Sequence, residues 1–203
     1  MIVYVETNFL LELTYLQERY ASCEEVLELA ATNRIVLAVP AFSVAEARAT
    51  WQRRASERRD FLESLRKHMR EVSRSAPFRD LTDRSRDFVA ALVASGEEPR
   101  ERLEEAIHEI ESTGVIIPLN SAILAISRVH EILYSLSPQD ALVLESVCWH
   151  GRTQSGPKCF ITQDAKGFAN PTVYDELAAI ECKVLVNFTD AVAYIRNAIE
   201  STG

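Results

Sequence analysis

The sequence lacks the features of secreted, membrane-spanning and disulfide-bonded proteins. Its first residues, Met1 to Glu6, contain no basic segment and no cleavage site, so we expect no secretory signal. The longest apolar runs are far too short to cross a bilayer, so we expect no membrane contact. The four cysteines form no C-x-x-C pair, which indicates reduced thiols. Together these absences predict a cytoplasmic protein.

Positive charge is also scarce. The chain has 22 basic and 30 acidic residues, a formal net charge of −8. A protein that binds nucleic acid through its overall charge would be basic, so a nucleic-acid partner would have to meet a local basic patch. The length of 203 residues and the 47% of hydrophobic residues fit one large globular domain with a substantial core.

Short apolar runs alternate with helical patterns along the chain. Because Pro118 cannot donate to a strand ladder, the run that contains it is the weakest strand candidate. Strands that alternate with helices predict an α/β fold, with a central parallel sheet and helices on both faces. The predicted strands are residues 2–5, 35–39, 115–119, 159–162 and 184–188, and the predicted helices are residues 9–18, 22–32, 43–74, 80–94, 99–112, 120–135, 138–149 and 189–200.

A long helical stretch, residues 47–112, separates the second predicted strand from the third. It exceeds what a simple crossover between parallel strands needs. We interpret it as a helical arm inserted into a single domain of residues 1–203, rather than as a second folding domain. We call residues 47–112 the helical arm.

Four acidic residues follow the predicted strands or begin the next helices. Glu6 ends the first strand and Asp164 follows the fourth, whereas Glu46 and Asp140 are placed in the first turns of helices. Ligands bind beyond the carboxyl ends of parallel strands, so we expect these four carboxylates to share one pocket. Mg²⁺ or Mn²⁺ would relieve their mutual repulsion and activate water for attack on a phosphodiester.

Each acid also has a purely structural interpretation. The segment Ser43 to Glu46 has the pattern of a helix-capping box, and Asp140 follows Ser137 in a similar pattern. Asp164 fits a turn after a strand. Glu6 fits a structural role least well, because a carboxylate at the end of a buried strand is costly unless something pairs with it.

The segments around these acids resemble the PIN-domain family of nucleases. That family opens with an apolar strand that runs into an acid, as in Val-Tyr-Val-Glu-Thr-Asn at residues 3–8. The second and third acids begin helices, as in residues 39–46 and 137–144. The fourth follows a strand in a Thr-x-Asp pattern, which matches residues 160–168. The resemblance covers residues 1–46 and 114–190 but leaves out the helical arm.

This resemblance implies a three-layer α/β/α sandwich and a metal-dependent endoribonuclease that cleaves single-stranded RNA. It implies that Asn8 holds the first acid or a metal-bound water, and that Thr162 gives a hydroxyl to the metal or phosphate network. Many members are toxins of toxin–antitoxin pairs, which makes an antitoxin a candidate partner and leaves a homodimer open. The family's first acid is normally aspartate, so Glu6 predicts lower activity, a preference for Mn²⁺ or a lost site.

Arginines are concentrated at the start of the helical arm. We assign a phosphate-contacting role to Arg48, Arg53 and Arg54, while a solvated helix face with ion pairs explains the same pattern. The sequence leaves two other functions open. One is a catalytically weak or inactive PIN-like module that binds RNA or a protein partner, and the other is a nuclease that acts on DNA.

Overall fold

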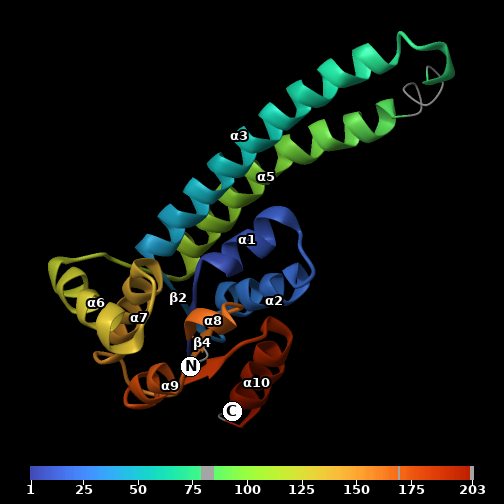
Figure 1. The fold of residues 1–203 in the computed structure, drawn as a ribbon. Coiled ribbons are helices and arrows are strands. Elements are labelled where there is room, and N and C mark those ends of the chain that lie inside the picture. The colour runs from blue at the N-terminus through green and yellow to red at the C-terminus, as the bar shows by residue number, and fades with distance from the viewer. Residues whose placement is uncertain (79–84, 169, 202–203) are drawn as a thin grey trace.

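The computed structural model describes residues 1–78, 85–168 and 170–201. Its centre is a sheet of five parallel strands in the order β3-β2-β1-β4-β5 (Figure 1). β1 and β4 are buried along their whole length, as the unbroken apolar runs predicted. All five predicted strands are present, and the third is short because it ends before Pro118. The strands are β1 (Ile2–Val5), β2 (Val36–Pro40), β3 (Val115–Ile117), β4 (Lys158–Ile161) and β5 (Cys182–Leu185).

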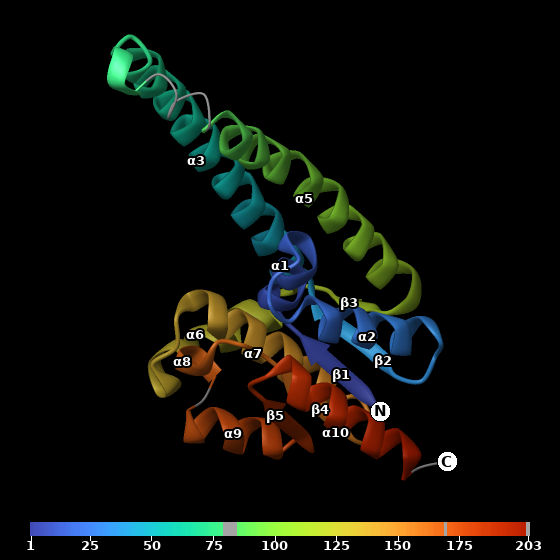
Figure 2. The same ribbon diagram turned by 90° about the vertical axis from the view of Figure 1, so that its right-hand side faces the viewer.

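Helices cover both faces of this sheet, which confirms the predicted α/β architecture. One core cluster joins one face to α1, α2, α10 and the last turns of α5 (Arg86–Thr113). A second core cluster joins the other face to α7 and α9 (Figures 1 and 2). α6 packs on the outer side of α7. The short helices α8 and α9 were not predicted from the sequence. The bounds are α1 (Thr7–Tyr15), α2 (Tyr20–Ala31), α6 (Ser121–Tyr134), α7 (Pro138–Gly151), α8 (Ala165–Phe168), α9 (Pro171–Ala178) and α10 (Phe188–Glu200).

The helical arm consists mainly of α3 (Ala41–Val72) and α5 (Arg86–Thr113), which lie side by side and extend beyond the sheet (Figures 1 and 2). The short 3-10 helix η1 (Ala76–Phe78) follows α3. The prediction of two helices, 80–94 and 99–112, is wrong because Pro99 lies inside the single helix α5. Packing of α5 against α3 and α1 holds the helix together across this missing backbone donor. Residues 80–84 of the first prediction lie outside the described residues.

Two of the predicted helix caps are absent. Ser22 and Glu25 also have the spacing of a capping box. A prediction of a cap there is wrong, because α2 begins at Tyr20. α3 begins at Ala41 directly after β2, so Ser43 lies inside the helix and caps nothing. The cap at Ser137 is confirmed, since its hydroxyl accepts a hydrogen bond from the backbone N–H of Asp140 at 3.1 Å. Two of the three capping patterns in the sequence therefore do not cap a helix.

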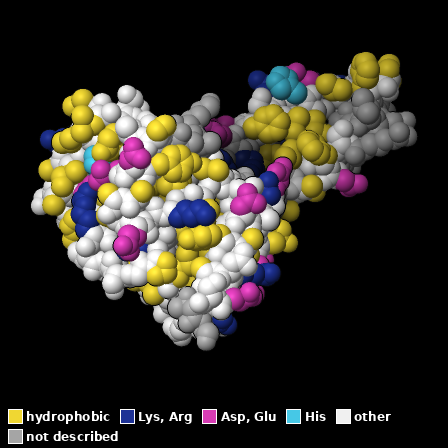
Figure 3. Space-filling model, turned by 90° about the horizontal axis from the view of Figure 1, so that it is seen from below, with side chains coloured by type: hydrophobic (Ala, Val, Ile, Leu, Met, Phe, Trp, Pro, Cys, Tyr) yellow, Lys and Arg dark blue, Asp and Glu magenta, His cyan; other side chains and the backbone are white. Residues whose placement is uncertain are grey.

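Hydrophobic side chains remain exposed on the outer face of α6. In Figure 3, yellow side chains gather at the left-hand end of the molecule, the side on which α6 lies in Figure 1. Within the described residues, no helix is both long and apolar enough to span a membrane. The exposed apolar residues of α6 are Leu124, Ile126, Val129, Ile132 and Leu133.

Candidate active site

The sheet order places a topological switch point between β1 and β4, where chain connections leave in opposite directions. Glu6 follows β1 directly and is only 5% exposed. Thr162 follows β4 and is fully buried. Its hydroxyl donates a hydrogen bond to Oε1 of Glu6 at 3.2 Å. The predicted first acid therefore lies at the position of the sheet where ligands of such folds bind.

Glu6 is a buried carboxylate with hydrogen-bond donors but without a cation. It also caps α1, because its Oε2 accepts the backbone N–H of Asn8 at 2.8 Å. Among the described residues, no basic side chain forms an ion pair with it. Burial raises the pKa of Glu6 to about 7, against the lowering effect of its hydrogen bonds. Glu6 is therefore a buried acid whose ionised form no cation in the described protein stabilises.

Asp140 and Asp164 approach each other beside Gly167. A Cβ atom placed on Gly167 would lie 2.9 Å from Oδ2 of Asp164 and 3.0 Å from Oδ2 of Asp140. Burial raises the pKa of Asp140, and the negative charge of Asp164 raises it further. Ser137 opposes this shift, because its hydroxyl donates to Oδ2 of Asp140 at 2.6 Å. The third and fourth predicted acids are therefore brought together, with a glycine allowing the approach.

The fourth acid in this group is connected to Glu6 through backbone and hydroxyl groups. The N–H of Asp164 donates to Oγ1 of Thr162 at 2.9 Å, and the same hydroxyl donates to Glu6. Oδ1 of Asp164 accepts the backbone N–H of Gly167 at 3.0 Å, which fixes the start of α8. Asp164 therefore has the turn role that the sequence allowed as well as a position near Glu6 and Asp140.

Glu46 approaches the site from α3. The prediction that it lies in the first helical turn is wrong, because α3 begins at Ala41 and Glu46 falls in the second turn. Its Oε2 accepts a short hydrogen bond from the hydroxyl of Thr7, the neighbour of Glu6 in sequence. One turn earlier on the same helix face, the buried hydroxyl of Ser43 has no hydrogen-bond partner in the described protein.

The contacts of the described residues do not gather the four acids in one cluster. Asp140 and Asp164 lie beside each other, Glu6 is joined to Asp164 through Thr162, and Glu46 is held by Thr7. In the described residues, no group of three or more histidine, cysteine, aspartate or glutamate side chains is arranged to hold a metal ion. Carboxylates without a cation repel one another, which favours the separate hydrogen bonds seen here. The donors at hand are carboxylate and hydroxyl oxygens, the ligand type of Mg²⁺ and Mn²⁺. The residues fit such a cation in chemistry, and its binding would require the acids to move closer.

Two residues of this arrangement were missed in the sequence. Thr7 positions Glu46, and Gly167 allows Asp140 and Asp164 to approach. Both lie inside the segments of the family resemblance, so their neighbourhood could have been noted, but their contacts are set by tertiary structure. The backbone N–H of Asn8 and the hydroxyl of Thr162 each donate a hydrogen bond to Glu6.

The arginines assigned to phosphate binding all have partners within the chain. Arg48 forms an exposed ion pair with Glu104 of α5 at 2.5 Å. Arg53 lies 4.0 Å from Glu57, and the guanidinium of Arg54 lies 4.9 Å from the ring centre of Tyr15. Exposed pairs of this kind are weak and easily exchanged. Phosphate binding by these arginines stays a prediction.

Comparisons with known proteins add no identification to this geometry. No protein-family model matches the chain, and neither curated proteins nor solved structures gave a match. The residues and their arrangement are therefore the basis for assigning a function: a buried carboxylate at the sheet's switch point, joined through Thr162 to a pair of neighbouring aspartates.

Proposed function

We propose that this chain is a divalent-metal-dependent endoribonuclease with a PIN-like three-layer fold, into which the helical arm is inserted. The observation that carries the proposal is the position of Glu6. A carboxylate buried at the switch point of a parallel sheet, with a raised pKa and no cationic partner in the described protein, is costly to the fold. Such strain is typical of functional sites.

Together with the other three acids, Glu6 can bind a divalent cation. Glu6, Glu46, Asp140 and Asp164 supply oxygen ligands for Mg²⁺ or Mn²⁺, and such a cation supplies, when bound, a nucleophilic water and neutralisation of charge on the phosphodiester. The hydrogen bonds of the chain orient these acids. Thr162 and the backbone of Asn8 hold Glu6, whereas Ser137 holds Asp140.

A cleavage assay tests the proposal directly. Purified protein is incubated with labelled single-stranded RNA in Mn²⁺, in Mg²⁺ or in EDTA. Wild type should cleave only with metal, and Asp140→Asn should lose nearly all activity because it removes one charged ligand. Asp175→Asn, which changes an exposed acid of α9, is the matched control and should retain activity. Equal cleavage by wild type and Asp140→Asn would refute the site assignment.

The second candidate is a non-catalytic PIN-like module that binds RNA or a protein partner. One observation favours it: the described acids do not form a group of three around a common centre. The glutamate at position 6, where the family has aspartate, is consistent with a weakened metal site. Calorimetric titration with Mn²⁺ and Mg²⁺ separates the two proposals, because the module should show no binding at millimolar metal or below.

Substrate and partner assignments are narrower forms of the same proposal. Parallel assays on RNA and DNA of the same sequence decide between a ribonuclease and a DNA nuclease. Membership of a toxin–antitoxin pair predicts a small adjacent reading frame whose product suppresses the activity. We keep a cytoplasmic location and a homodimer as parts of this proposal, and light scattering measures the oligomeric state.

A further inference from the structure

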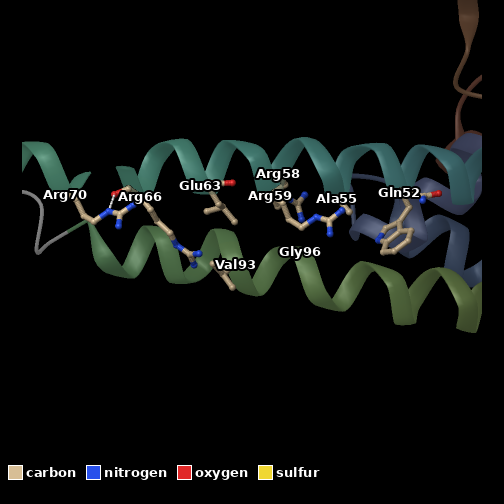
Figure 4. Close-up of a pocket in the computed structure, with 11 residues that line it drawn as sticks. Gln52, Ala55, Arg58, Arg59, Glu63, Arg66, Arg70, Val93 and Gly96 are labelled. Atoms are coloured by element: carbon tan, nitrogen blue, oxygen red, sulfur yellow. Dashed lines mark hydrogen bonds between the residues drawn. The ribbon is translucent and has the colours of Figure 1, made fainter. Parts of the chain in front are cut away.

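A groove runs along the helical arm between α3 and α5, and none of the four acids lines it. It encloses about 710 Å³ and is lined by residues of both helices (Figure 4). Its α3 residues recur every three or four positions, which places them on the face of α3 that meets α5. The residues that matter for its chemistry are Trp51, Arg58, Arg59, Leu62, Arg66 and Arg70.

Positive charge dominates the lining of this groove. Four of its residues are arginines and one, Glu63, is acidic. Within the described part of the chain, none of these arginines forms an ion pair with a carboxylate. Arg58 donates to the backbone carbonyl of Ser95, and Nε of Arg70 donates to the carbonyl of Arg66 at 3.3 Å. The groove thus offers guanidinium groups whose charge is uncompensated.

Other arginines of the helical arm differ in this respect. Arg48 is paired with Glu104, and Arg53 lies beside Glu57. The groove therefore gathers four arginines without a carboxylate partner among the described residues, whereas Arg48 and Arg53 are paired outside it. Arginine is well suited to phosphate, because its planar guanidinium can donate two parallel hydrogen bonds to phosphate oxygens.

The floor of the groove is apolar. Leu62 is only 8% exposed, and Val93 lies opposite on α5. Trp51 lines the end of the groove nearest the sheet. A strand that offers both phosphates and unpaired bases satisfies both parts of this lining, since bases pack on aromatic and apolar side chains. A duplex keeps its bases stacked inside, so the lining favours a single strand.

The groove also has the length and position that a substrate strand needs. Trp51 and Arg70 lie about 28 Å apart along the helix axis, from the rise per residue of an α-helix. Trp51 follows Glu46 on the same helix at about 8 Å. A strand held in the groove would therefore lead toward the acids at the end of the sheet.

We propose that the groove between α3 and α5 binds the sugar-phosphate backbone of single-stranded RNA and guides it toward the acidic site. This inference rests on the proposed ribonuclease function and adds to it the contacts that hold the substrate. It also assigns the main phosphate contacts to Arg59, Arg66 and Arg70, which line the groove. The sequence had assigned them to Arg48, Arg53 and Arg54, but these three already have partners within the chain.

Binding is tested in EDTA, so that no cleavage can occur. The anisotropy of a labelled single-stranded RNA of about 20 nucleotides is titrated with protein at several salt concentrations. The groove variant is Arg66→Gln with Arg70→Gln, and the matched control is Lys67→Gln with Arg74→Gln. Both pairs remove two positive charges from the same part of the helical arm, but only the first pair lines the groove.

The groove variant should raise Kd about tenfold and reduce the salt dependence of log Kd by about 1.4, as expected for two lost phosphate contacts. The control pair should change Kd by less than about twofold. Equal weakening in both pairs, or none in either, overturns the proposal. Competition by polyglutamate as effective as that by RNA would also overturn it, because the groove would then be a site for an acidic protein partner.

Failure of this inference is distinguishable from failure of the proposed function. Asp140→Asn should bind RNA as wild type does in EDTA, because the groove does not use the acids. If the groove variant binds weakly while wild type cleaves no RNA with any metal, the binding site stands and the nuclease fails. If wild type cleaves and the groove variant binds and cleaves normally, the nuclease stands and the groove proposal fails. Thermal melting of each variant confirms that the fold is kept.

Discussion

The hydroxyl of Thr162 donates a hydrogen bond to Glu6 over 3.2 Å, although the two residues are 156 positions apart. This contact joins the ends of β1 and β4. Because a hydrogen bond to the ionised form lowers an acid's pKa, it opposes the rise that burial causes. The pKa of Glu6 thus lies near neutral pH, where small changes in its surroundings alter its charge.

The raised pKa of Glu6 predicts that stability falls as pH rises. In the folded state Glu6 keeps its proton up to about pH 7, whereas the unfolded chain loses it near pH 4.5. Between these values the folded state binds more protons, so the free energy of unfolding should fall by about 3 kcal/mol in EDTA. Urea unfolding at several pH values measures this slope.

Glu6→Gln is the control for this pH dependence, because the amide cannot ionise. It should flatten the fall in stability between pH 4.5 and 7, whatever its effect on absolute stability. Thr162→Val should extend the fall to higher pH, since it removes a hydrogen bond that lowers the pKa of Glu6 in the folded state. An unchanged slope in Glu6→Gln would show that another group causes the dependence.

A side chain at Gly167 should displace the two neighbouring carboxylates. In Gly167→Ala the new methyl would meet the carboxylates of Asp140 and Asp164 at 3.0 Å or less, so these acids must separate. We expect a loss of about 1 kcal/mol in stability and weaker Mn²⁺ binding by calorimetry. Gly96→Ala is the helical control, because its nearest atoms in Arg58 are 3.5 Å away. That variant should gain about 0.5 kcal/mol, and equal effects of both changes would contradict the prediction.

The buried Glu145 depends on Arg152 for its charge balance. Glu145 is fully buried, and its Oε1 accepts a hydrogen bond from Arg152 at 2.9 Å. Arg152→Ala should destabilise the fold by about 3 kcal/mol in urea unfolding, because it removes the charged partner of a buried carboxylate. His130 would remain 3.7 Å from Glu145, but burial lowers its pKa and disfavours its charged form. Adding Glu145→Gln should restore part of this loss by removing the charge. A double variant as unstable as the single one would show that charge is not the cause.

The two faces of α6 should respond differently to truncation. Ile123 is fully buried whereas Ile132 is 81% exposed. Ile123→Ala should cost about 3 kcal/mol through lost burial and a cavity. The same change at Ile132 should alter stability by less than about 0.5 kcal/mol. Thermal unfolding of both variants provides the comparison, and a large loss at Ile132 would indicate that another surface covers this face.

Local patterns in the sequence predicted most of the helices and strands. Unbroken apolar runs predicted the strands because central parallel strands are buried on both faces. The cap at Ser137 was also predictable, since it depends on residues only three positions apart. Signals of this kind failed where packing opposed them, as at Pro99, which lies inside the continuous helix α5.

By itself, the sequence determined the parallel α/β fold and the places of Glu6, Asp140 and Asp164, because these are encoded over a few neighbouring residues. It misplaced Glu46, because α3 begins earlier than the local pattern indicates. Only the tertiary structure decided how those acids meet: Glu6 with Thr162, Glu46 with Thr7, and Asp140 beside Asp164 at Gly167. Packing of α3 on α5 likewise selected which arginines line a groove and which form ion pairs. Contacts between distant segments depend on strand order and helix packing, and no local pattern specifies these.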